Sequence, residues 1–121
     1  MPHLNLEYSD NLPELKVDVL LLRLNHALLA SGQFADELDI KSRAQAFANY
    51  QVGTALAARA FAHVRLAILS GRTEAVKKQL SAHLLEVLRE TIPAQPGLDI
   101  QLCVEVLDIE REPYAKLRLP G

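Results

Sequence analysis

The stretch AHVRLAILSGRT, residues 62–73, decides the fold of this chain. Ala62, Val64, Leu66 and Ile68 alternate with other side chains, which is the period of two that a strand with unlike faces shows. Ser70-Gly71 ends this strand, and the hydroxyl residue Thr73 is placed to cap a helix. The stretch therefore predicts a strand that leads directly into a helix.

The helix and a second strand follow from the residues after Thr73. Apolar residues recur at the spacing of one helix face: Val76, Leu80, Leu84, Val87 and Leu88. Pro93 and Pro96-Gly97 should end the helix. We expect a last core strand over residues 99–107, and a tail from Pro113 onwards that pairs as an edge strand.

The same pattern occurs 60 residues earlier, in the first half of the chain. His3 aligns with His63, and Leu38-Asp39-Ile40 aligns with Leu98-Asp99-Ile100. Helix positions align as well: Leu20 with Leu80, Leu24 with Leu84, and Leu28 with Leu88. Self-similarity at a fixed offset indicates a duplicated unit. We predict one domain over residues 1–121, with an internal repeat of residues 2–61 and 62–121.

The first repeat also reads as strand, helix, strand. Leu4, Leu6 and Tyr8 alternate as a strand, and Pro2 continues their face. The sequence Asp-Asn-Leu-Pro at residues 10–13 predicts a helix start with proline in the first turn, and Gly32 predicts its end. The second strand is expected over residues 40–49.

Two β-α-β units imply an α/β (α+β) fold, namely a four-stranded mixed sheet with two helices on one face. The other face would be open. Apolar residues occur on both faces of the second-half strands: Phe61, Leu69, Leu102, Val104 and Val106. We therefore expect partner subunits to cover the open face around a rotational axis.

Composition limits the classes of function. The net charge of −2 provides no basic field, so we expect no nucleic-acid partner. No apolar run is long enough to span a membrane, so we expect no membrane partner. A single cysteine, Cys103, and an amino terminus without a basic and apolar leader favour the cytoplasm. The usual phosphate-loop and zinc motifs are missing, and we predict no metal site.

Pro2 is the first candidate for chemistry. A free prolyl nitrogen is a secondary amine that can accept and return a proton, although most prolines at this position have no chemical role. An ordinary α-amino group has a pKa of about 7.7–8.0. The pKa of proline is higher, and burial and nearby cations would lower it to a value suited to a base at neutral pH. For this chemistry Met1 must be removed, because an acylated nitrogen is an amide.

Three cationic residues are candidates for binding an acidic ligand. Arg72 lies between a strand end and a helix start, where helix amides and a guanidinium can hold a carboxylate together. Lys41 and Arg43 are two apart on the predicted second strand and so face the same way. The alternatives are an ordinary exposed arginine and a solvated strand face.

At these residues the chain resembles the tautomerase superfamily, most closely the 5-carboxymethyl-2-hydroxymuconate isomerase family. The resemblance is carried by Pro2-His3-Leu4 with the stretch Glu7–Asn11, by Ile40-Lys41-Ser42-Arg43, and by Phe61–Val64 through Arg72. The segment Ile68–Thr73 also resembles the short-chain 4-oxalocrotonate tautomerases, in which one β-α-β unit is the whole subunit.

The resemblance implies a homotrimer that needs no cofactor and isomerises a small-molecule carboxylate in aromatic compound (homoprotocatechuate) degradation. Pro2 would move the hydroxyl proton of a dienol to a distal carbon, and Arg72 would bind a carboxylate or the developing oxyanion. Arg43 matches an arginine of the family. Lys41 departs from it, since related isomerases can carry arginine there, and Tyr50 falls where an aromatic residue can line the pocket.

Three functions remain open from the sequence. The first is the isomerisation of 5-carboxymethyl-2-hydroxymuconate or a similar acidic dienol. The second is tautomerase activity on a different, phenylpyruvate-like keto acid, which the lysine at position 41 would favour. The third is a non-enzymatic oligomeric interaction module.

Overall fold

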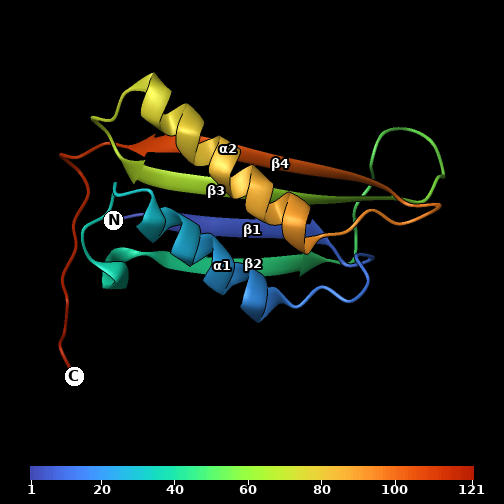
Figure 1. Cartoon of the computed structure of the whole chain (residues 1–121), viewed down its shortest axis with the longest axis horizontal. Helices are drawn as coiled ribbons and strands as arrows, with labels where there is room; N and C mark the ends of the chain where they lie inside the picture. Colours follow the sequence, from blue (N-terminus) through green and yellow to red (C-terminus); the bar gives the residue numbers. More distant parts are fainter.

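A four-stranded sheet carries two α-helices across one face in the structure, a computed structural model that describes residues 1–121 (Figure 1). The elements in chain order are β1 (His3–Ser9), α1 (Val17–Ala30), the short 3-10 helix η1 (Glu37–Asp39), β2 (Lys41–Phe47), β3 (Arg59–Leu69), α2 (Glu74–Thr91) and β4 (Asp99–Ile109). The predicted fold class, with both helices on one face of a mixed sheet, is confirmed.

The strand order is β2-β1-β3-β4. Each parallel pair, β1 with β2 and β3 with β4, is joined through one α-helix, and β1 pairs antiparallel with β3 in the centre. His3 lies opposite Lys41 on one side and Ala67 on the other. The starts of β1 and β2 therefore meet the ends of β3 and β4 at one end of the sheet, which we call the Pro2 end.

The core lies between the helices and the sheet. Leu4, Leu66 and Ile68 on the central strands are fully buried. The helix leucines that align in the two repeats are buried as well: Leu20, Leu24, Leu28, Leu80, Leu84 and Leu88. The spacing of three or four residues that predicted the helices is thus the spacing of the residues that hold them on the sheet.

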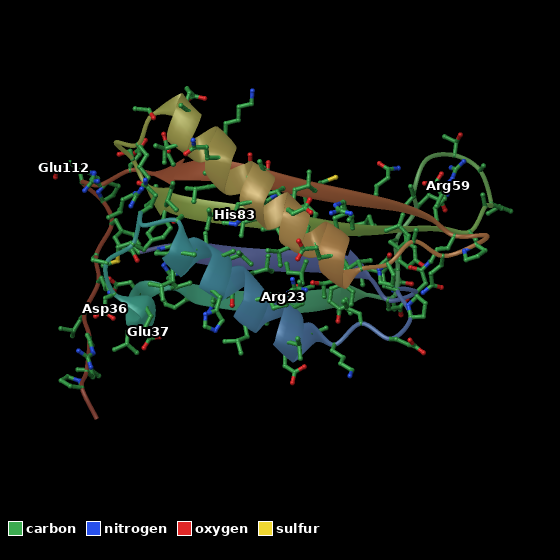
Figure 2. The ribbon with its side chains drawn as sticks, in the orientation of Figure 1. Arg23, Asp36, Glu37, Arg59, His83 and Glu112 are labelled. Carbon is green, nitrogen blue, oxygen red and sulfur yellow. The ribbon has the colours of Figure 1, made fainter.

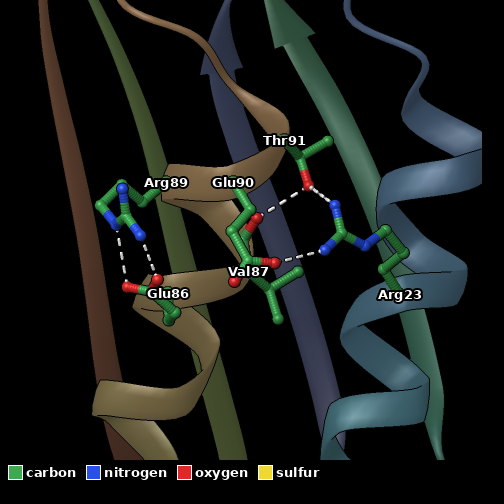
Figure 3. A network of polar contacts seen from close by, with 6 residues as sticks. All are labelled: Arg23, Glu86, Val87, Arg89, Glu90 and Thr91. Atoms are coloured by element: carbon green, nitrogen blue, oxygen red, sulfur yellow. Dashed lines mark hydrogen bonds and ion pairs between the residues drawn. The ribbon is translucent and has the colours of Figure 1, made fainter.

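Polar contacts tie the two helices together at one end (Figure 3). The Arg23 guanidinium on α1 donates to the Glu90 carboxylate at 2.6 Å and to Thr91 Oγ1 at 2.7 Å. Thr91 in turn donates to the carbonyl of Val87 at 2.7 Å. An exposed ion pair adds little to the free energy of unfolding, so this network mainly fixes how the helix ends meet.

The start of α1 differs from the prediction. The helix begins at Val17, and no side chain caps it at Lys16. Residues 10–13 are held by other contacts: the Asp10 amide donates to the Phe47 carbonyl at 3.0 Å, and Asn11 Nδ2 donates to the Arg59 carbonyl at 2.9 Å. Because these bonds tie the segment to the neighbouring strands, the proline at residue 13 precedes the helix instead of lying in its first turn.

The tail was also predicted wrongly, since residues 113–121 form no strand. Side-chain contacts hold the tail at the Pro2 end, where Tyr114 meets His3 and Lys116 meets Asp39. Beyond them Leu117 and Leu119 are more than four-fifths exposed. The tail passes the same end of the sheet as the amino terminus in Figure 1. The predicted cap of α2 is confirmed, because Thr73 Oγ1 accepts from the Val76 amide at 3.2 Å.

The face of the sheet without helices has apolar side chains at the two ends of β3 and charged side chains in the middle of β3 and β4. Phe61 and Leu69 lie on this face and are half-buried, whereas Leu102, Val104 and Val106 pack towards the helices. Midway along these strands the Glu105 carboxylate contacts Arg65 at 2.8 Å and His63 at 3.4 Å. Apolar residues thus occur on both faces of the second-half strands, as expected, but the open face is not an apolar surface throughout.

The two ends of the sheet are far apart in Figure 2, which labels Asp36, Glu37 and Glu112 at the Pro2 end and Arg59 at the other. This separation decides which of the candidate residues can act together within one chain.

Neither helix is long and apolar enough to cross a membrane.

Candidate active site

Pro2 lies directly before β1 with its ring buried against the core. Its carbonyl accepts a hydrogen bond from the Lys41 amide at 3.2 Å, which extends the pairing of β1 with β2 by one residue. The burial that the Leu4 and Leu6 face predicted for Pro2 is confirmed. The residue is therefore fixed in position at the edge of the apolar core.

The amino terminus beside Pro2 lies among charged groups. Burial lowers the pKa of the Met1 amine most, and Lys41, Lys116 and Arg72 lower this pKa further. Asp39 acts in the opposite direction and raises it. An amine at this position is accordingly shifted towards its neutral, basic form.

Arg72 is held rigidly at the turn between β3 and α2. Its Nη2 donates to the Gln33 carbonyl at 2.7 Å, Nε donates to Gln33 Oε1 at 3.3 Å, and Nη1 donates to the Leu69 carbonyl at 3.3 Å. The guanidinium also lies over the Phe34 ring, 4.8 Å from its centroid. A guanidinium has five N–H donors, so these contacts orient it and leave donors for a carboxylate.

Glycine is required in the turn that presents this arginine. Gly71 has a φ of +123°, which a residue with a side chain rarely adopts. The Arg111 guanidinium donates to the Ser70 carbonyl at 2.6 Å and closes the turn from the side of the tail. The conformation of the backbone, and not only the identity of residue 72, therefore sets where the guanidinium lies.

Lys41 and Arg43 share one face of β2 next to β1, as predicted. Lys41 Nζ donates to the Asp39 carbonyl at 2.5 Å, and burial followed by the nearby Lys116 lowers the pKa of Lys41. Arg43 Nη2 donates to His3 Nδ1 at 2.8 Å. Since a guanidinium can only donate, Nδ1 is an acceptor, and the ring proton on Nε2 faces the Tyr114 hydroxyl at 3.0 Å.

His3 is therefore in its neutral form in this arrangement. Burial is the main cause that lowers the pKa of His3, and Lys41 and Arg43 lower it further. Its contacts join β1, β2 and the tail at the Pro2 end.

Tyr50 lies at the opposite end of the sheet, beyond the end of β2. Its ring meets Phe61 edge-on, with centroids 6.0 Å apart. Together with Asn11 and Arg59 it lines an open hollow of about 430 Å³. The structure thus brings Pro2, Arg72, Lys41 and Arg43 to one end of the sheet and does not bring Tyr50 to them.

The structure adds five residues to the site that the sequence did not indicate: Gln33, Phe34, Asp39, Tyr114 and Lys116. Only Asp39 had a signal, because it lies in the repeated tripeptide. No group of three or more histidine, cysteine, aspartate or glutamate side chains is placed to hold a metal ion.

Comparisons with known proteins agree on one family. Residues 2–116 match the family described as CHMI, 5-carboxymethyl-2-hydroxymuconate isomerase. A 5-carboxymethyl-2-hydroxymuconate isomerase from Deinococcus radiodurans R1 is 34% identical, with a TM-score of 0.89 over 98% of this chain and 90% of that chain. No curated protein matches the chain.

Two further solved structures share the fold at lower identity. A 5-carboxymethyl-2-hydroxymuconate delta-isomerase is 19% identical, with a TM-score of 0.79 over 99% of this chain and 89% of its own. A fused 4-OT symmetric trimer is 20% identical, with a TM-score of 0.67 over 90% of this chain and 86% of its own.

Proposed function

Because the chain belongs to the 5-carboxymethyl-2-hydroxymuconate isomerase family and is an isomerase of the tautomerase superfamily, we propose that Pro2 is its catalytic base and acid. The substrate is 5-carboxymethyl-2-hydroxymuconate or a similar acidic dienol. The single observation that supports this proposal best is the burial of Pro2 at a chain end surrounded by cationic side chains. The non-enzymatic alternative does not hold for a member of an isomerase family.

The reaction needs only one proton and no cofactor. The lone pair of the Pro2 nitrogen, free after removal of Met1, takes the proton of the enol hydroxyl. The electrons of the O–H bond form the carbonyl, and the double bonds shift along the carbon chain of the substrate. The distal carbon then takes the proton back from the prolinium nitrogen. The product is the conjugated ketone, and the amine returns to its neutral state.

The cations around Pro2 have two roles in this scheme. Arg72 binds a substrate carboxylate or the developing oxyanion with the donors that Gln33 and Leu69 leave free. Lys41 and Arg43 attract and orient the anionic substrate from β2. An acidic ligand needs such local cations, because the chain as a whole has a net charge of −2.

We propose a homotrimer as the active assembly. The open sheet face, with Phe61 and Leu69 at the two ends of β3, provides a surface for neighbouring copies. Tyr50 is at the far end of the sheet from Pro2 of its own chain, so it can line a Pro2 pocket only from another copy. The fused 4-OT trimers, which share this fold, support the assembly.

Lys41 favours the alternative substrate, a phenylpyruvate-like keto acid. Its Nζ is engaged with the Asp39 carbonyl, and an ammonium lacks the two-pronged geometry with which a guanidinium binds a carboxylate. A site with one weaker carboxylate contact would suit a substrate with one carboxylate.

A substrate panel tests these proposals. We expect the chain that begins at Pro2 to turn over 5-carboxymethyl-2-hydroxymuconate with a higher kcat/KM than phenylpyruvate. The reverse order would assign the enzyme to the keto acid, and no turnover of either would contradict both. The exposed free Cys103 is typical of a reducing compartment, which supports the cytoplasm. Membership of the 5-carboxymethyl-2-hydroxymuconate isomerase family supports a role in aromatic compound degradation such as the homoprotocatechuate route.

A further inference from the structure

The C-terminal tail places a lysine beside the amino terminus of the chain. Lys116 Nζ lies 2.5 Å from Asp39 Oδ1, and both side chains are about one-third exposed, at 31% and 33%. The pair joins residues 77 positions apart, so its formation depends on the path of the tail.

Two other contacts fix that path. The Tyr114 hydroxyl meets His3 Nε2 at 3.0 Å, with the two rings edge-on and their centroids 6.2 Å apart. Arg111, at the start of the tail, donates to the Ser70 carbonyl at 2.6 Å. The tail is thus attached to the turn before α2 and to β1 before it reaches Asp39.

Asp39 is an unfavourable neighbour for the proposed chemistry. A carboxylate beside the amino terminus stabilises the protonated amine, which cannot act as a base, and repels an anionic substrate. The charged groups that face the amine come from four elements: Asp39 at the end of η1, Lys41 at the start of β2, Arg72 before α2, and Lys116 in the tail. Lys116 is the one that is paired with the carboxylate.

We propose that Lys116 is a positioning residue of the active site, which neutralises Asp39 and so keeps the surroundings of Pro2 cationic for an acidic substrate. The inference rests on the proposed function, because it assigns the tail a role in supporting the Pro2 amine. It gives residues 110–121, which form no helix or strand, a part in the reaction.

Lys116→Met tests the proposal, since methionine keeps much of the apolar stem and removes the charge. Protonation of the amine should become easier, so the acid limb of kcat/KM against pH should move to higher pH. At a pH on that limb kcat/KM should fall roughly threefold to tenfold. Combining Lys116→Met with Asp39→Asn in a double variant should restore the wild-type pH profile of kcat/KM. Arg118→Met, which removes an exposed tail cation without a hydrogen bond or ion pair, should leave the profile unchanged.

A titration of the amine by NMR with ¹⁵N-labelled proline, in the chain that begins at Pro2, provides a readout without turnover. The pKa of the amine should be higher in Lys116→Met than in the wild type and should return in the double variant. A lower melting temperature with unchanged titration and pH profile would show that Lys116 only anchors the tail, and would overturn the proposal. Inactivity of the wild type would count against the proposed function, whereas the titration would still decide the role of Lys116.

Discussion

The Arg72 guanidinium is held by Gln33, Leu69 and Phe34 before any substrate binds. A group that is already oriented loses little entropy when the charge of the transition state develops, and in its proposed role Arg72 would contribute to the rate in this way. We expect Arg72→Ala to lower kcat/KM roughly 100-fold or more. Steady-state kinetics measure this, and an unchanged kcat/KM would remove Arg72 from the mechanism.

Lys41→Ala is the matched control on the other side of Pro2. Lys41 is the first residue of β2, and its ammonium donates a hydrogen bond to the Asp39 carbonyl. At a pH above the acid limb we expect this variant mainly to raise KM with a small change in kcat, because in the proposed scheme the lysine attracts substrate without contacting the reacting atoms. The acid limb should move to higher pH, as in Lys116→Met, because Lys41 also lowers the pKa of the amine. A loss of kcat as large as that of Arg72→Ala would contradict the different roles assigned to the two cations.

Removal of Met1 is a further prediction at the scale of a single residue. While Met1 is attached, the Pro2 nitrogen is an amide without a basic lone pair. Mass spectrometry of active protein should show a chain that begins at Pro2, and a form that retains Met1 should lose nearly all isomerase activity. If that form turned over substrate as fast as the processed one, the base would have to be a side chain.

Local signals in the sequence predicted some site residues and could not predict others. Strand alternation predicted Pro2 on the buried face, and the strand-to-helix turn predicted Arg72 between a strand end and a helix start. Gln33 contacts Arg72 across 39 residues, and Tyr114 contacts His3 across 111. Such contacts depend on how elements pack, and no periodicity within a single element reports them.

The helix α2 carries a prediction because its cap immediately follows Arg72. The Thr73 hydroxyl accepts the Val76 amide, and loss of this bond in Thr73→Ala should lower the free energy of unfolding by about 1 kcal/mol. We expect kcat/KM to fall as well, since the first turn of the helix fixes the backbone beside the guanidinium. Chemical denaturation and kinetics measure the two effects.

Ser81→Ala on the same helix is the control for this variant. Ser81 is half-buried within α2, and its hydroxyl donates only to the Lys78 carbonyl. Alanine has the highest helix propensity, so this change should not lower stability and should leave kcat/KM unchanged. Equal losses in both variants would mean that removal of any hydroxyl from α2 has the same effect, and the cap would have no special role.

Elements with a strong period were predicted from the sequence, and so was the start of α2, where Thr73 gives a local capping signal. The start of α1 and the path of the tail were not predicted. The leucine spacing predicted both helices, and the alternation around Leu66 predicted the central strand β3. The start of α1 was missed because hydrogen bonds from Asp10 and Asn11 to other strands outweigh the preference of proline for a first helical turn. The tail was missed because side-chain contacts, and not strand pairing, hold it.

The molecule as a whole has one sheet face that its own helices do not cover. We expect light scattering to show a trimer in solution at micromolar concentration, and a stable monomer would contradict the assembly. Arg65→Glu places a second carboxylate beside Glu105, midway along β3 and β4 on this face. Two unpaired carboxylates are costly to bury under a neighbouring copy, so this variant should shift the protein towards monomers. Arg89→Glu, the same charge reversal on the exposed surface of α2, should not.

With Pro2 as the proposed base, the position of the amino terminus limits the reactive nitrogens to one per chain. The residue that aligns with Pro2 in the second repeat is Ala62, which is fully buried within β3 and has an ordinary peptide nitrogen. Each chain therefore has two β-α-β units and a single terminal nitrogen. One equivalent of an amine-directed inactivator per chain should abolish turnover, and the second repeat is free to serve as scaffold without a reactive end of its own.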